Sequence, residues 1–95
     1  MSWRVILRPK AEGDLSEAAR WYERQRQHLG GQFLDEIGRA LNLLALSPEG
    51  HPVYYRGFRR LPTRRFPYKL FYLIEGKDVI VVRVLHAKRD HRLHL

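Results

Sequence analysis

The chain has 95 residues, of which 44% are hydrophobic, and this length predicts a single domain over residues 1–95. It contains no cysteine, which excludes disulfide frameworks, zinc–thiolate sites and cysteine nucleophiles. Its net charge of +8 lies entirely after residue 51, because residues 1–51 carry seven Lys+Arg and seven Asp+Glu whereas residues 52–95 carry eleven and three. A positive surface that attracts polyanions, such as RNA or an acidic protein segment, is therefore expected in the C-terminal half.

The first half of the chain predicts one strand and two helices. Apolar residues alternate over residues 3–7 and indicate a short strand. Residues 11–29 carry an apolar stripe at helical spacing, and Gly30-Gly31 is expected to end this helix and to reverse the chain. A second apolar face indicates a helix over residues 32–46. Two helices joined by two glycines form an antiparallel hairpin, and we expect their apolar faces to pack against a sheet.

The second half predicts a β-hairpin that follows a loop. Residues 49–57 contain two glycines and a proline, which indicates a loop. Residues 58–61 indicate a short edge strand, because a proline follows them. Residues 66–74 and 79–86 indicate two strands joined by a tight turn, and the near-continuous apolar run of the second predicts a central strand covered on both faces. The fold class is therefore α+β, a helical hairpin packed on a small antiparallel sheet.

The turn fixes a register for this hairpin. With Gly76-Lys77 at the centre of the turn, Lys69 faces Val84, and Pro67 faces His86. Side chains alternate along a strand, so Lys69 and His86 are expected on one face near the open end of the hairpin, although a loop of odd length would flip this arrangement. A lysine can stabilise phosphate charge and a histidine can transfer a proton near neutral pH. The alternative is a solvated strand lysine beside a histidine that ends a strand, and these two residues alone favour that alternative.

Cations interleave with aromatic residues at the start of the hairpin. This mixture suits nucleic acid or another target through charge and stacking, and a solvated basic rim explains it equally well. The candidate target-binding residues are Arg59, Arg60, Arg64, Arg65 and, in the C-terminal tail, Arg92. Three histidines near the end of the chain lack a carboxylate pair that would complete a metal site, so neither a metal nor a cofactor is expected.

Six short motifs follow one another along the chain: Ala11-x-x-Asp14-Leu15, Trp21-Tyr22-Glu23, Leu29-Gly30-x-x-Phe33, Leu44-x-x-x-Pro48, Arg65-Phe66-Pro67-Tyr68-Lys69-Leu70-Phe71-Tyr72 and Val82-x-Val84-Leu85-His86-x-x-Arg89-Asp90. In this order they resemble the RelE/ParE superfamily of toxins from type II toxin–antitoxin modules. The resemblance implies a helical hairpin against an antiparallel sheet, growth inhibition, and a cognate antitoxin that neutralises the toxin in a hetero-oligomer. It implies a cytoplasmic protein with no membrane partner, which agrees with the lack of any run of roughly 20 apolar residues.

The resemblance leaves the cellular target open. ParE-like members inhibit DNA gyrase, and the second helix and the Phe66-Pro67-Tyr68 strand resemble that branch. RelE-like members cut mRNA on the ribosome without a metal. For that activity Lys69 and Arg89 match family cations, and His86 would handle a proton. The tail of this chain has no Tyr or Trp, which RNA-cutting relatives use there. A third reading is an inactive member that keeps only antitoxin binding.

Overall fold

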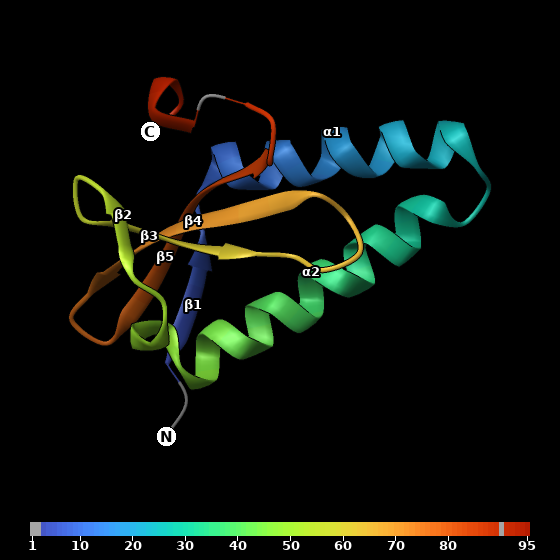
Figure 1. Ribbon diagram of the computed structural model, residues 1–95. Helices are drawn as coiled ribbons and strands as arrows, with labels where there is room; N and C mark the ends of the chain where they lie inside the picture. The colour runs from blue at the N-terminus through green and yellow to red at the C-terminus, as the bar shows by residue number, and fades with distance from the viewer. Residues whose placement is uncertain (1–2, 90) are drawn as a thin grey trace.

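A computed structural model gives the fold of the protein and describes residues 3–89 and 91–95. The elements follow in the order β1 (Arg4–Leu7), α1 (Pro9–Gln25), α2 (Leu29–Leu46), a 3-10 turn η1 (Pro48–Gly50), β2 (Val53–Tyr55), β3 (Phe58–Pro62), β4 (Tyr68–Glu75), β5 (Asp78–His86) and a 3-10 turn η2 (His91–Leu93) (Figure 1). The strands form one sheet in the order β1-β5-β4-β3-β2. The sheet is antiparallel from β5 to β2, and β1 joins β5 in parallel. Among the described residues, no helix is both long enough and apolar enough to cross a membrane.

Both helices pack on one face of the sheet (Figure 1), as the sequence predicts. The predicted apolar face of α2 is confirmed, because it supplies the buried side chains of Phe33, Ile37, Ala40 and Leu44. A second, smaller cluster forms on the opposite face of the sheet and contains Phe71, Ile80, Val82 and Leu85. Since β5 contributes buried residues to both clusters, it is the doubly covered strand that its apolar run predicts.

The chain reverses between the helices earlier than the glycines predict. α1 ends at Gln25, and the turn ends at His28, which adopts a left-handed φ of 72°. The carboxylate of Glu23 accepts hydrogen bonds from the N–H groups of His28 and Gly30 at 2.8 and 3.0 Å. These bonds lower the pKa of Glu23 and satisfy amides at the start of α2. The predicted helix end at residue 29 is therefore wrong, because a side-chain cap sets the boundary rather than the glycine pair.

Gly30 instead allows α1 and α2 to approach each other closely. A Cβ atom at Gly30 would lie 2.5 Å from the carbonyl oxygen of Ala19 in α1, whereas a Cβ atom at Gly31 would meet nothing within 4 Å. The first glycine is thus required by packing, and the second occupies open space in the first turn of α2.

We predict opposite effects on stability for the two glycines. Gly30→Ala forces the helices apart and lowers the free energy of unfolding by about 1–3 kcal/mol. Gly31→Ala causes no clash and reduces the conformational freedom of the unfolded chain. It therefore raises the free energy of unfolding by up to about 1 kcal/mol. Urea denaturation of both variants measures the difference. Equal effects of the two substitutions would contradict the close approach of the helices at Gly30.

The predicted loop before β3 contains a further strand. β2 spans Val53–Tyr55 and pairs with β3, so β3 is an inner strand and not the predicted edge. The strand is missed in the sequence because it is only three residues long and its pairing shifts register between Val53 and Tyr55. Arg56 and Gly57, with φ values of 49° and 83°, make the turn into β3.

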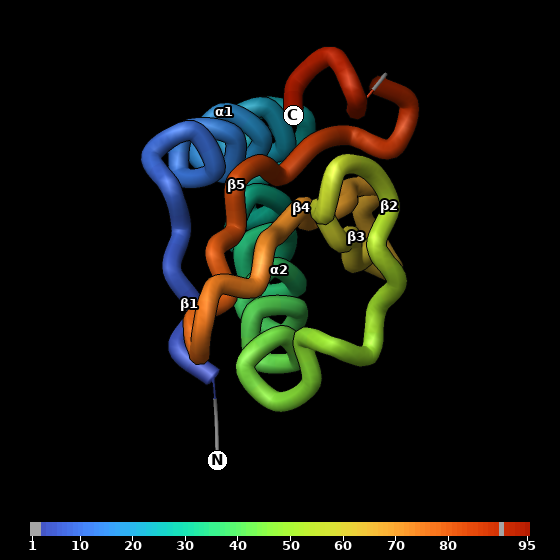
Figure 2. Tube along the Cα trace, turned by 90° about the vertical axis from the view of Figure 1, so that its left-hand side faces the viewer, coloured from blue at the N-terminus to red at the C-terminus, as the bar shows by residue number. Residues whose placement is uncertain are grey.

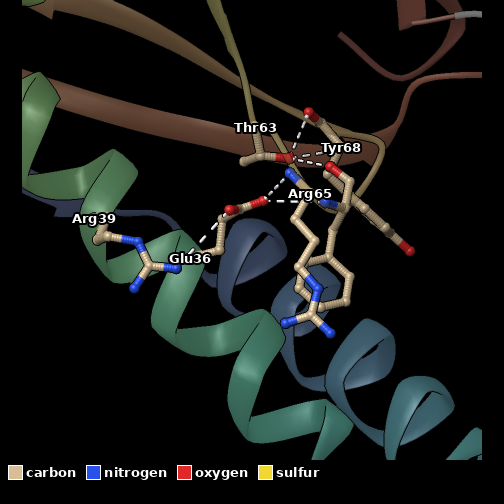
Figure 3. Close-up of polar contacts among 6 residues, drawn as sticks. Glu36, Arg39, Thr63, Arg65 and Tyr68 are labelled. Carbon is tan, nitrogen blue, oxygen red and sulfur yellow. Dashed lines mark hydrogen bonds and ion pairs between the residues drawn. The ribbon is translucent and has the colours of Figure 1, made fainter.

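β4 begins at Tyr68 rather than at residue 66, because a hydrogen-bonded turn precedes it (Figure 3). The hydroxyl of Thr63 donates to the carbonyl of Phe66, and the N–H of Tyr68 donates to the same carbonyl at 2.8 Å. From α2, the carboxylate of Glu36 accepts the N–H groups of Arg65 and Phe66 at 2.7 and 3.0 Å. The side chain of Glu36 therefore fixes the backbone of the turn to the helical layer.

The register of the β4–β5 hairpin agrees with the prediction near the turn and slips further out. Pairing runs as expected from Glu75–Asp78 to Tyr72–Val81, after which β5 contains one extra residue and Phe71 pairs with Arg83. Lys69 consequently pairs with Leu85, and Tyr68 pairs with His86. The predicted Lys69–Val84 and Pro67–His86 pairs are therefore wrong, because a β-bulge of one residue moves every later side chain to the other face.

Candidate functional site

The bulge in β5 is fixed by an ion pair with α1. The carboxylate of Asp14 accepts hydrogen bonds from Nε and Nη2 of Arg83, both at 2.8 Å, and from the N–H of Val84 at 3.0 Å. The two charged side chains are only 13% and 16% exposed. This bidentate contact holds α1 against β5 and defines the surfaces on either side of the end of β5.

One of these surfaces is a hollow of about 710 Å³ between α1 and the end of β5, here called the aromatic groove. Its aromatic lining consists of Trp21, Tyr22, Tyr68 and His86, and charged side chains flank it. Trp21 is 50% exposed and stands edge-on to Tyr22 at 5.1 Å. Burial raises the pKa of Tyr68, whose ring lies 5.3 Å from that of His86.

The second surface is a hollow of about 480 Å³ on the opposite face of the sheet, here called the basic cleft. It is lined by four cations, two tyrosines, an alanine and a histidine: Arg60, Lys69, Arg89, Arg92, Tyr54, Tyr55, Ala87 and His91. The guanidinium carbon of Arg60 lies 4.0 Å from the centre of the Tyr54 ring. Figure 2 shows the C-terminal segment passing between α1 on one side and β2 on the other, and Arg89 in this segment lines both hollows.

The structure separates the predicted Lys69, His86 and Arg89 set. Lys69 and Arg89 both line the basic cleft, whereas His86 lines the aromatic groove on the other face. Nδ1 of His86 accepts the N–H of Lys88 at 3.1 Å. A single ligand in the basic cleft can thus contact the two cations but not the imidazole of His86.

Only some of the predicted target-binding arginines line the basic cleft. Arg60 and Arg92 line the basic cleft. Arg59 donates from its guanidinium to the carbonyl of His51 at 2.6 Å and holds the segment before β2. Arg64 and Arg65 lie in the turn before β4 and line neither hollow.

His91 is part of this architecture but has no clear signal in the sequence. Its side chain is 4% exposed, its Nε2 lies 3.0 Å from the carbonyl oxygen of His86, and its ring packs 4.7 Å from that of Phe71. The tail has no helical or strand period, so the sequence does not indicate a buried residue there. Asp90, the last residue of the terminal motif, lies outside the described residues. Among the residues that are described, no group of three or more His, Asp or Glu side chains could hold a metal ion.

We predict that the Asp14–Arg83 pair contributes strongly to stability. Asp14→Asn leaves Arg83 largely buried without a compensating charge and lowers the free energy of unfolding by about 3 kcal/mol. Asp35→Asn, at an exposed position in α2, is the matched control and changes the free energy of unfolding by less than about 0.5 kcal/mol. Chemical denaturation compares the two, and similar small effects would refute a structural role for the pair.

The fold is an α+β domain in which two helices cover one face of a five-stranded sheet. A family model described as the ParE toxin of type II toxin-antitoxin system, parDE, matches residues 5–91. The chain belongs to the ParE toxin family. No curated protein matches the chain.

Two solved structures have the same fold. One is described as the chromosomal ParDE TA system from P. aeruginosa. It has a TM-score of 0.82 and 18% identity, and the match covers 92% of this chain and 98% of the other. The other is the RelBE2 toxin-antitoxin complex from Mycobacterium tuberculosis. It has a TM-score of 0.58 and 21% identity, and the match covers 90% and 99% of the two chains. The expected α+β fold and the resemblance to RelE/ParE toxins are both confirmed.

Proposed function

We propose that this ParE-family chain inhibits bacterial growth by binding DNA gyrase in the cytoplasm, and that it does not cut RNA. The family match supports the toxin role. The observation that favours binding over cleavage is the position of His86 on the face opposite Lys69. Cleavage by attack of the RNA 2′-OH needs a proton-transfer group within about 3 Å of the reacting atoms, beside the cations that stabilise the phosphate.

The histidine that lines the basic cleft, His91, does not replace His86 in this role. His91 is buried, its ring packs against Phe71, and its Nε2 donates to a backbone carbonyl. Its Nε2 proton is therefore engaged within the protein. The basic cleft can hold negative charge, but no described histidine is placed in it to transfer a proton.

A comparison of two purified systems tests the proposed target. We expect the chain to inhibit negative supercoiling by bacterial gyrase and to leave mRNA intact on purified ribosomes. Cleavage of mRNA would instead favour the ribonuclease alternative. In that case Lys69→Ala and Arg89→Ala should each lower the rate by about 10²–10³. Inhibition of neither system, together with unimpaired growth at verified expression, would favour an inactive member of the family.

We further propose that a cognate antitoxin neutralises the chain in a hetero-oligomer by covering the aromatic groove. The two solved structures are described as toxin–antitoxin assemblies, which supports such a partner. The groove offers exposed apolar area at Trp21, with cations at Arg24, Lys88 and Arg89 on its border. Apolar burial should dominate the affinity, and acidic residues of the partner should set the association rate and its salt dependence. A short acidic reading frame beside the gene would support this proposal.

Trp21 provides the test of this surface. Trp21→Ala is expected to weaken antitoxin binding by about 2 kcal/mol or more, because a half-exposed aromatic residue in a groove is a typical binding hot spot. Leu46→Ala is the control, since Leu46 is 69% exposed and does not line the groove. Isothermal titration with the co-encoded antitoxin measures both variants. Equal affinities of the two would place the antitoxin elsewhere.

A further inference from the structure

We infer that the turn between β3 and β4 is a preorganised contact for an acidic segment of the antitoxin, and that Glu36 is the residue that positions it. The turn spans residues 63–67 and is here called the arginine turn, because Arg64 and Arg65 are both exposed on it. The inference rests on the proposed antitoxin partner. It adds a second contact region, with a stated chemistry, at one end of the aromatic groove.

The backbone of the arginine turn is held in one conformation by Glu36. A single oxygen of its carboxylate, Oε2, accepts the N–H groups of both Arg65 and Phe66, at 2.7 and 3.0 Å (Figure 3). The hydroxyl of Thr63 and the N–H of Tyr68 close the turn from inside, because both donate to the carbonyl of Phe66. Two successive N–H groups that converge on one point form a typical anion site. Since Glu36 fills this site, a further anion can bind the turn only through its arginine side chains.

The arginines of this region keep their positive charge available. Among the described residues, Arg64 has no hydrogen-bond, ion-pair or ring partner. The guanidinium carbon of Arg65 lies 5.0 Å from the centre of the Phe66 ring, which orders this side chain without neutralising it. Figure 3 shows Arg39 on the other side of Glu36, where the two form a weak pair at 3.9 Å and the Arg39 side chain is 69% exposed. One carboxylate, already engaged by two backbone N–H groups, does not balance three arginines.

The chemistry of the arginine turn fits a carboxylate-rich protein segment better than a nucleic acid. A guanidinium matches the two oxygens of a carboxylate with two parallel hydrogen bonds. A single-stranded nucleic acid also needs exposed aromatic rings on which its bases stack. Phe66 is only 5% exposed and packs inward on Tyr22 and Phe33. Within residues 63–67, all of which the structure describes, the turn therefore offers charge but no exposed aromatic ring.

The position of the turn points to the antitoxin as the source of the acidic segment. Pro67, the last residue of the turn, lines the aromatic groove, and so does Tyr68, which follows it. A segment that fills the groove beside Pro67 therefore lies next to the turn, and a short continuation of it brings carboxylates to Arg64 and Arg65. The groove then supplies apolar burial, and the charges of the turn fix the register of the bound segment.

Two double variants that each remove two exposed arginines test the charge of the turn. Arg64→Gln with Arg65→Gln alters the turn, whereas Arg8→Gln with Arg20→Gln removes the same charge from α1 and its N-cap, at positions that line neither hollow. Surface plasmon resonance measures association and dissociation of the product of the short reading frame beside the gene. At about 0.05 M salt, the turn variant should associate about tenfold more slowly than the wild type, and the control variant less than about threefold more slowly. At about 0.5 M salt the two variants should associate alike, because screening removes the electrostatic steering.

Glu36→Gln separates positioning from charge. The substitution removes a negative charge beside the arginines, so a purely electrostatic role of Glu36 predicts a tighter complex. A positioning role predicts dissociation about fivefold faster without slower association, because the loosened turn must be ordered in the complex. Asp35→Asn is the control, since it removes an exposed neighbouring charge that does not hold the turn, and its dissociation should not be faster. Hydrogen exchange at the amides of Arg65 and Phe66, in a variant whose circular dichroism shows a folded chain, measures the loosening.

Several results would overturn the inference while leaving the antitoxin proposal intact. These are equal kinetics of the two double variants, or a tighter complex for Glu36→Gln. Loss of gyrase inhibition or of oligo-dT binding by the turn variant, with unchanged antitoxin kinetics, would assign the turn to another partner and would also overturn it. Failure of the proposed antitoxin is a different result, because the wild type would then not bind the neighbouring gene product at all, and the inference would fall with it.

Discussion

The contact between Asp14 and β5 decides how the two layers of this protein meet. A β-bulge disrupts the ladder of backbone hydrogen bonds at one point, and here the carboxylate of Asp14 accepts the N–H of Val84 beside that point. The same carboxylate forms a bidentate pair with Arg83. α1 therefore compensates for the irregularity in β5, and the bulge in turn gives α1 its anchor on the sheet.

The bulge has consequences for the whole end of the sheet. It places His86 beside Tyr68 on the helical face and leaves Lys69 on the opposite face. The helical face becomes an aromatic groove bordered by both signs of charge, and the opposite face becomes a cleft lined by cations. One inserted residue thus separates a lysine and a histidine that regular pairing would place together, and it gives the two faces different chemistry.

Features that depend on hydrophobic periodicity could be predicted from the sequence. The apolar face of α2, the buried strand β5 and the turn at Gly76-Lys77 follow from spacing and turn chemistry. The features that could not be predicted depend on contacts between residues distant in the chain. Glu23 ends the interhelical turn through backbone N–H groups, and Asp14 accepts the N–H of Val84, 70 residues away, beside the bulge. Neither contact changes the local pattern of apolar residues, so no reading of that pattern could reveal it.

Arg89 lies where the two hollows meet. Its side chain borders both the aromatic groove and the basic cleft, and a single guanidinium cannot fill both roles at once. A molecule that draws Arg89 into one hollow removes a cation from the other and thereby weakens binding there. Thermodynamic linkage makes this antagonism reciprocal and equal in size in the two directions. If each hollow binds a ligand through Arg89, the two faces of the sheet are coupled through this one side chain, without any change in the fold.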